Sequence, residues 1–145
     1  MYPVNVAKVA ATLGGQRILG TQLNTVSELA AAVAHGLPKT VVGELTTHAA
    51  SDPESRRRIA ALVVSPATFK RSRQLSPTAS ERAERLARVT ALAQQALGSD
   101  DEARAWLSEN HLLLGGLPPI EVAATDLGAR QVERILLNIE HNLPV

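Results

Sequence analysis

The chain has 145 residues, with 15 lysines and arginines, 14 aspartates and glutamates, no cysteine and a formal net charge of +1. This length suits one compact domain or two small ones, and 45% hydrophobic residues are enough for a buried core. The lack of cysteine excludes disulfides and thiol catalysis and fits a reducing compartment. No apolar run or signal-peptide pattern indicates a membrane, so we expect a cytoplasmic protein.

Helix start signals recur along the chain. Three capping-box patterns, in which a hydroxyl residue precedes a glutamate by three positions, begin at Thr25, Ser51 and Ser99. Ser65 and Ser76 each precede a proline, which combines an N-cap with a first-turn proline. The predicted helices cover residues 4–13, 26–35, 38–48, 54–63, 66–73, 77–97, 100–107, 119–124 and 128–143. No strand is indicated, so the predicted fold class is all-α.

Glycines and apolar spacing add detail to these helices. A break is predicted at Gly14-Gly15, and Gly98 is predicted to end the long helix. Within that helix, Glu81–Arg85 and Glu84–Arg88 are spaced as i, i+4 ion pairs. The last helix carries an apolar stripe of Val132, Ile135, Leu136, Ile139 and Leu143.

The near-neutral net charge hides an uneven distribution. Residues 1–55 have three basic and four acidic side chains, residues 56–88 have nine and two, and residues 89–145 have three and eight. The three segments therefore carry net charges of −1, +7 and −5. A basic segment beside an acidic one indicates polyanion binding, although clustering on a solvated helix face is the competing interpretation.

The basic segment has the pattern of a DNA-binding helix-turn-helix, with a short turn at Val63-Val64-Ser65 between two helices. The second helix would enter the major groove, while Phe69 is expected to point into the core. The candidate DNA-binding residues are Arg56, Arg57, Thr68, Lys70, Arg71, Arg73 and Arg82. Basic contacts to phosphates would supply affinity and salt dependence.

Ordered motifs in the C-terminal third resemble the Xre/MbcA/ParS-type toxin-binding domain of antitoxins. They include Ala103-Arg-Ala-Trp106-Leu107, Asn110, Leu114-Gly115-Gly116, Pro118, Thr125, Gly128, Val132-Glu133, Leu136 and Ile139-Glu140-His141. A looser resemblance to the Xre-like helix-turn-helix region runs upstream through Gly36-Leu37-Pro38 and Ser65 to Arg71. Asn142 stands where relatives often have glycine, and asparagine tolerates the left-handed conformation. Because the sequence ends at residue 145, we expect any longer C-terminal tail to be absent or very short.

The resemblance implies an antitoxin that covers the active site of a RES-domain toxin, an enzyme that consumes NAD⁺ or transfers its ADP-ribosyl group. It also implies autoregulation through operator DNA and a homodimer within a larger complex. The implied division is an N-terminal entry segment (residues 1–24), an Xre-like helix-turn-helix and dimerisation region (25–98) and a toxin-binding domain (99–145). The candidate toxin-binding residues are Trp106, Asn110, Leu114, Gly115, Gly116, Pro118, Glu133, Glu140, His141 and Asn142.

Several alternatives remain at this point. Trp106 can belong to the core or anchor a partner, and the Leu112–Leu117 turn can plug the domain or form an exposed patch. Asp126, Glu133 and Glu140 can meet a basic toxin site or face solvent. The chain as a whole can also be a stand-alone helix-turn-helix regulator whose C-terminal domain only dimerises.

No enzymatic constellation is present in the sequence. His35, His48, His111 and His141 lack metal-ligand spacing, and no serine lies in a G-x-S-x-G motif. Residues 14–17 do not form a phosphate-binding loop. We therefore expect neither catalysis nor a metal or other cofactor.

Overall fold

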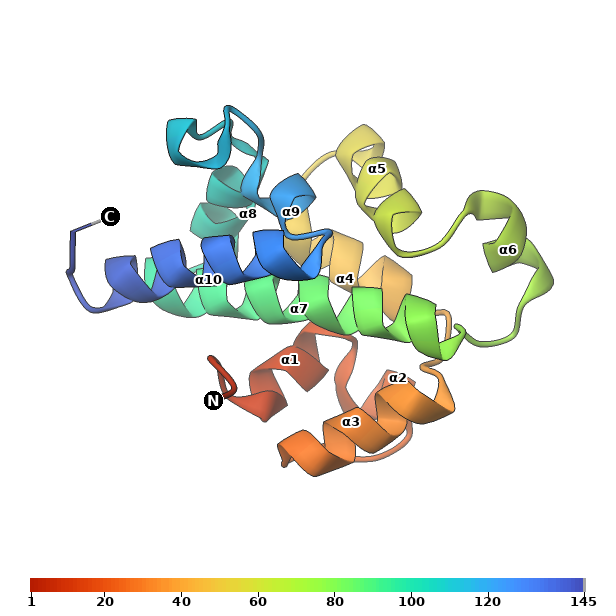
Figure 1. Cartoon of the computed structure of the whole chain (residues 1–145). Helices are drawn as coiled ribbons and strands as arrows, with labels where there is room; N and C mark the ends of the chain where they lie inside the picture. The colour runs from red at the N-terminus through yellow and green to blue at the C-terminus, as the bar shows by residue number, and fades with distance from the viewer. Residues whose placement is uncertain (145) are drawn as a thin grey trace.

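A computed structural model describes residues 1–144 and shows an all-α fold (Figure 1). Within the described residues, the helices are α1 (Val6–Thr12), α2 (Gly15–Leu19), α3 (Val26–His35), α4 (Val41–Ala49), α5 (Pro53–Val63), α6 (Pro66–Arg71), α7 (Pro77–Leu97), α8 (Asp100–Ser108), the 3₁₀ turn η1 (Leu112–Leu114), α9 (Pro119–Val122) and α10 (Asp126–Glu140). The predicted fold class is confirmed.

The long helix α7 is the central helix, against which most of the other helices pack. In Figure 1, α10 runs alongside α7, while α1 and α3 lie on the other side of it. Leu86, Val89 and Leu92 of α7 are fully buried, and α7 also packs against α4, α5 and α8. The two regions predicted from sequence therefore share one helix and one continuous core. The boundary between residues 98 and 99 stays a prediction.

The N-terminal segment belongs to the same core. Val6, Val9 and Leu13 are buried, and α1 packs against α3, α4 and α7. The predicted break at Gly14-Gly15 is only partly correct, because helix α2 begins at Gly15 directly after the left-handed Gly14. A short helix of this kind leaves no periodic pattern that would reveal it in the sequence.

Capping follows the sequence at most predicted helix starts. Ser99 is the N-cap of α8 and accepts from the Glu102 amide at 3.1 Å, but the reciprocal Glu102 side-chain bond of a capping box is not formed among residues 1–144. The Thr25–Glu28 capping box is complete, and the left-handed Gly98 ends α7. The box predicted at Ser51 is wrong. Asp52 is the N-cap of α5 and accepts a hydrogen bond from the Ser55 amide, because the proline that follows it occupies the first helical position.

One predicted ion pair of α7 and the predicted apolar stripe of α10 also need correction. The Glu84–Arg88 pair forms at 3.5 Å, but Arg85 donates to the Ala124 carbonyl, and no Glu81–Arg85 ion pair occurs in the part of the chain described. Tertiary contact with the α9–α10 connection replaces the local pair. The predicted apolar stripe ends early, since α10 stops at Glu140 and Leu143 is exposed.

Residues 1–144 include no helix that is both long enough and apolar enough to cross a bilayer.

Candidate functional sites

Helices α5 and α6 form the predicted helix-turn-helix shape. Val64 and Ser65 connect them, and the Ser65 hydroxyl accepts a hydrogen bond from the Thr68 amide at 3.2 Å to begin α6. Helix α6 ends at Arg71, two residues earlier than predicted, and contains no buried residue. Figure 1 shows it projecting from the body at one end of α7.

Most of the predicted DNA-binding side chains face solvent. The exposed members are Arg57, Thr68, Lys70, Arg71, Arg73 and Arg82. Among the exposed members, Arg82 also donates from Nη1 to the Val63 carbonyl at 3.4 Å. Arg56 differs because it is half-buried and its Nε donates to the Ala50 carbonyl at 3.0 Å. A guanidinium held in this way stabilises the start of α5 and is less available to DNA.

An apolar groove of about 430 Å³ separates α6 from α4 and α5. Val42, Ala60 and Phe69 line it together with Arg56, Arg57 and Lys70. The structure thus brings these three cations to one groove. Phe69 is half-buried on the groove wall, which partly confirms that it points inward.

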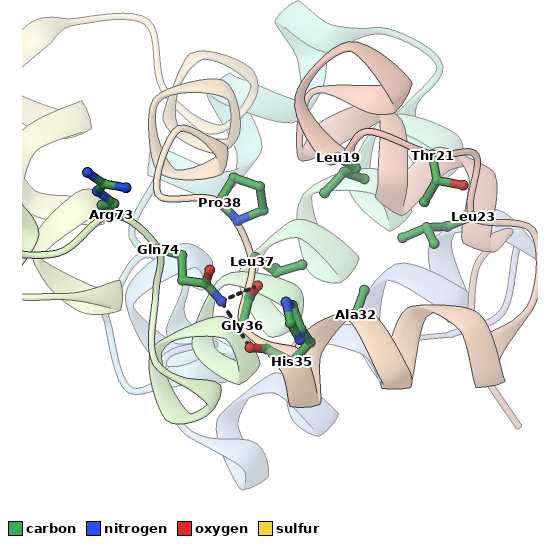
Figure 2. Close-up of a pocket in the computed structure, with 10 residues that line it drawn as sticks. All are labelled: Leu19, Thr21, Leu23, Ala32, His35, Gly36, Leu37, Pro38, Arg73 and Gln74. Carbon is green, nitrogen blue, oxygen red and sulfur yellow. Dashed lines mark hydrogen bonds between the residues drawn. The ribbon is translucent and has the colours of Figure 1, made fainter.

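The strap that follows α6 (residues 72–76) is bound to the turn between α3 and α4. Gln74 Nε2 donates to the His35 and Gly36 carbonyls at 3.0 and 3.2 Å, as Figure 2 shows, and the Leu75 amide donates to the Leu37 carbonyl at 2.8 Å. Gly36 has φ +104°, and a Cβ there would overlap the Leu75 carbonyl. Only glycine fits this close approach.

Arg73 lies at the edge of this same region. It borders a cavity of about 340 Å³ with Leu19, Leu23 and His35, and it stands apart from the other labelled side chains in Figure 2. Lys70 and Arg57 are on the α4–α5–α6 groove instead. The predicted basic set is therefore divided between two places.

The loop between α8 and α9 presents an apolar surface. Leu112, Leu113 and Leu117 are 97%, 61% and 53% exposed, whereas Leu114 is 6% exposed. Both sequence interpretations are thus partly correct, because Leu114 plugs the domain while its neighbours form an exposed patch. We call Leu112, Leu113 and Leu117 the leucine patch.

Backbone hydrogen bonds hold this loop in shape. The Gly116 amide donates to the His111 carbonyl at 2.9 Å, and the His111 amide donates to the Leu117 carbonyl at 3.2 Å. Gly115 and Gly116 have φ of +70° and +80°, with open space where a Cβ would be. They are needed for their left-handed backbone rather than for lack of room.

Trp106 supports the same loop from α8. It is half-buried against the core, and its ring lies 4.9 Å from that of His111. Trp106 therefore serves the core and also borders the leucine patch through His111. Asn110 is exposed beside the loop, and Pro118 is half-buried at the start of α9.

The predicted toxin-binding residues at the C-terminus follow α10. His141 and Asn142 are exposed, and Asn142 has φ +56°, which confirms the expected left-handed conformation. Glu140 accepts a hydrogen bond from Gln95 Nε2 at 2.7 Å. Its carboxylate is thus directed to α7.

Glu133 is also engaged with α7. Its Oε1 lies 2.8 Å from Arg88 Nε, and the side chains of Glu133 and Arg88 are 15% and 19% exposed. Burial raises the pKa of Glu133 above its usual range despite the arginine. Burial and the Glu84 carboxylate, which accepts from the Tyr2 hydroxyl at 2.6 Å, likewise raise the pKa of Tyr2. This network joins the N-terminus, α7 and α10, a contact that no sequence pattern indicated.

Acidic and metal-ligating groups are otherwise dispersed. Asp126 is exposed at the start of α10 and pairs with Arg130 at 3.3 Å. Among residues 1–144, no group of three or more histidines, aspartates or glutamates could hold a metal ion.

Comparison with known proteins assigns both regions. The Xre-like helix-turn-helix domain of antitoxins matches residues 28–88, and the Antitoxin Xre/MbcA/ParS C-terminal toxin-binding domain matches residues 92–141. A curated relative named Antitoxin Xre, from Pseudomonas putida strain KT2440, is 30% identical over 112 residues, covering 77% of this chain and 70% of that relative. The matches include α5 and α6 in the first domain and the leucine patch in the second. The chain belongs to the Xre antitoxin family and combines a helix-turn-helix domain with a toxin-binding domain.

Proposed function

We propose that this chain neutralises a RES-domain toxin by covering its active site, and that it represses its own operon by binding operator DNA. The proposal rests on the hydrogen-bonded loop that exposes the leucine patch on the domain matched as toxin-binding. The identity of the toxin as an NAD⁺-consuming enzyme follows from the family resemblance. The proposed assembly is a homodimer of this chain within a larger complex.

The toxin contact is proposed to be mainly apolar. Three leucines exposed within six residues form a patch that a soluble surface seldom carries without a partner. Covering one leucine side chain contributes roughly 1.5–3 kcal/mol. Because the loop's own hydrogen bonds already fix its backbone, binding would cost little conformational entropy.

The acidic residues have a smaller proposed role. Glu133 and Glu140 are engaged with Arg88 and Gln95, so we assign them to the orientation of α10 rather than to direct competition with NAD⁺ phosphates. Trp106, Asn110, Leu114, Gly115, Gly116 and Pro118 would shape and support the loop, while His141 and Asn142 would extend the contact from the end of α10. Asp126 stays available at the start of α10, since its ion pair with Arg130 is exposed.

The DNA contact is proposed to centre on α6. Thr68, Lys70 and Arg71 would meet base edges and phosphates, and Arg57 would add a phosphate contact from α5. Arg73 and Arg82 would extend the contact on either side, and Arg56 would act indirectly by stabilising α5.

The family resemblance implies a toxin gene beside that of the antitoxin, so the decisive experiment uses the product of the adjacent gene, expressed with and without this chain. NAD⁺ consumption by that product should stop with the wild-type chain and should persist with Leu112→Asp/Leu113→Asp. Leu127→Asp is the matched control, because Leu127 is also exposed (74%) in the same domain but lies outside the patch. Full inhibition by the double variant would contradict the proposed contact.

The same samples test the alternative of a stand-alone regulator. That alternative predicts no complex with the adjacent product, together with a loss of dimers in Leu112→Asp/Leu113→Asp. A co-purifying complex that the double variant disrupts while dimers persist supports the antitoxin function.

A further inference from the structure

We propose that Lys39 is a positioning residue for DNA recognition, holding α6 in its working orientation through Phe69 without touching DNA. The inference rests on the proposed DNA-binding function of α6. Lys39 lies in the turn before α4, 30 residues from Phe69, and no charge or spacing pattern connects the two.

Helix α6 has a weak apolar anchor. It has six residues, none of them fully buried, and Phe69 is the one of them that packs against the core, half-buried on the wall of the groove of about 430 Å³ between α6 and helices α4 and α5. The Ser65 cap is internal to the start of α6, since its hydroxyl accepts from the Thr68 amide, whereas the segment after α6 is tied to the body by the Gln74 and Leu75 hydrogen bonds to the α3–α4 turn. The orientation of α6 about its own axis therefore also depends on contacts made by residues of the helix.

Lys39 makes two contacts with α6, both to Phe69. Its Nζ donates to the Phe69 carbonyl at 3.1 Å and lies 4.6 Å from the centre of the Phe69 ring. That carbonyl belongs to the last turn of α6, where carbonyls have no partner within the helix. A cation there satisfies an orphan acceptor, complements the helix dipole and attracts the ring face.

These contacts decide where the neighbouring side chains point. Successive residues of an α-helix are rotated by about 100°, so fixing the ring and carbonyl of Phe69 fixes the directions of Thr68 and Lys70. Both of these side chains are exposed, and Lys70 also lines the groove beside Phe69. Lys39 itself is half-buried and its ammonium group donates to the Phe69 carbonyl, whereas Lys70 has an exposed side chain.

The two lysines should therefore differ in how salt affects their contribution to binding. A phosphate contact releases counterions, so log K falls with log salt. Loss of one such contact makes this fall shallower, reducing the magnitude of the slope by about 1. Loss of a positioning contact lowers specific affinity and leaves that slope unchanged. This separates an indirect role from a direct one.

The test is a salt titration of DNA binding with two duplexes of equal length, one from the region immediately upstream of the gene and one of random sequence. Lys39→Met removes the ammonium and keeps the apolar stem, and Lys39→Arg can both donate and stack. We expect Lys39→Met to lose about tenfold in affinity for the upstream duplex, with an unchanged slope and little change on the random duplex. Lys39→Arg should remain within about threefold of wild type.

Lys70→Ala is the matched comparison, and thermal unfolding with toxin neutralisation shows that each variant is folded. The inference would be overturned if Lys39→Met made the salt dependence shallower, or if it lost equal affinity for both duplexes, because Lys39 would then contact phosphate. Unchanged affinity in Lys39→Met with a weakened Lys70→Ala would also overturn it. Unchanged binding in both variants would refute the DNA-binding role of α6, and the inference with it.

Discussion

Helix α6 and the 111–117 loop both project from the body, but they are held in place differently. The loop closes on itself through backbone hydrogen bonds between His111, Gly116 and Leu117. Helix α6 depends instead on residues outside it, because Lys39 contacts Phe69 and Gln74 ties the segment after α6 to the α3–α4 turn. A self-closed loop keeps its shape independently of distant residues, whereas α6 can be displaced by changes elsewhere in the helix-turn-helix domain. The two functions should therefore be separable by mutation.

The largest expected effect separates them directly. Lys70→Ala/Arg71→Ala removes two exposed cations of α6 and should cost about 2 kcal/mol or more of DNA-binding free energy, roughly thirtyfold. Toxin neutralisation should be unchanged, because the loop is anchored on its own. Gel shifts on the upstream duplex measure DNA binding and the NAD⁺ assay measures toxin neutralisation. Unchanged DNA affinity would refute the DNA-binding role of α6.

Gly36→Ala should break the strap that holds α6. It forces a side chain into a backbone with φ +104° and against the Leu75 carbonyl, so we expect about 2–4 kcal/mol of lost stability. DNA binding should fall before toxin neutralisation does as temperature rises. Thermal unfolding monitored together with both assays tests this order, and parallel loss of both activities would show that the two regions are not separable.

Gly116→Ala makes the matched change in the loop and should be milder. The backbone is left-handed at φ +80°, but nothing lies where the new Cβ would be, so the strain is about 1–2 kcal/mol. The expected result is weaker toxin binding with unchanged DNA affinity. A destabilisation as large as that of Gly36→Ala would mean that the loop contributes more to the core than its exposure indicates.

Glu133→Gln should have the smallest effect and act on the shared body. Burial raises the folded-state pKa of Glu133 above its unfolded value, so its contribution to stability is complete below the unfolded pKa and is lost as pH rises through the folded pKa. The glutamine variant should therefore show a flatter fall of stability across that window. Denaturant unfolding at several pH values measures it, and the ratio of DNA to toxin affinity should stay constant.

The sequence predicted local structure well where local chemistry decides it. Both ends of α7 follow from Ser76-Pro77 and Gly98, and Thr25 with Glu28 correctly predicts the start of α3. Two competing caps misled the prediction at Ser51, since Asp52 also offers an acceptor and is the residue used. The exposed position of most basic candidates was likewise predictable from charge, because isolated arginines seldom become buried.

Contacts between distant segments could not be predicted in this way. Lys39 with Phe69, Arg88 with Glu133 and Gln74 with Gly36 join residues 30 or more positions apart. Their geometry depends on how helices pack, and no periodicity encodes it. The partial exposure of the apolar turn was undecided for the same reason, since burial of Leu114 depends on the domain beneath it.

Sequence alone determined the all-α class, the helix boundaries set by caps and glycines, the basic middle and the family resemblance, because these depend on neighbouring residues and ordered motifs. The tertiary structure decided which charges are free, which leucines face outward and how α6 is held. These properties depend on burial and on hydrogen bonds between segments, which exist only after α7 has brought the two regions together.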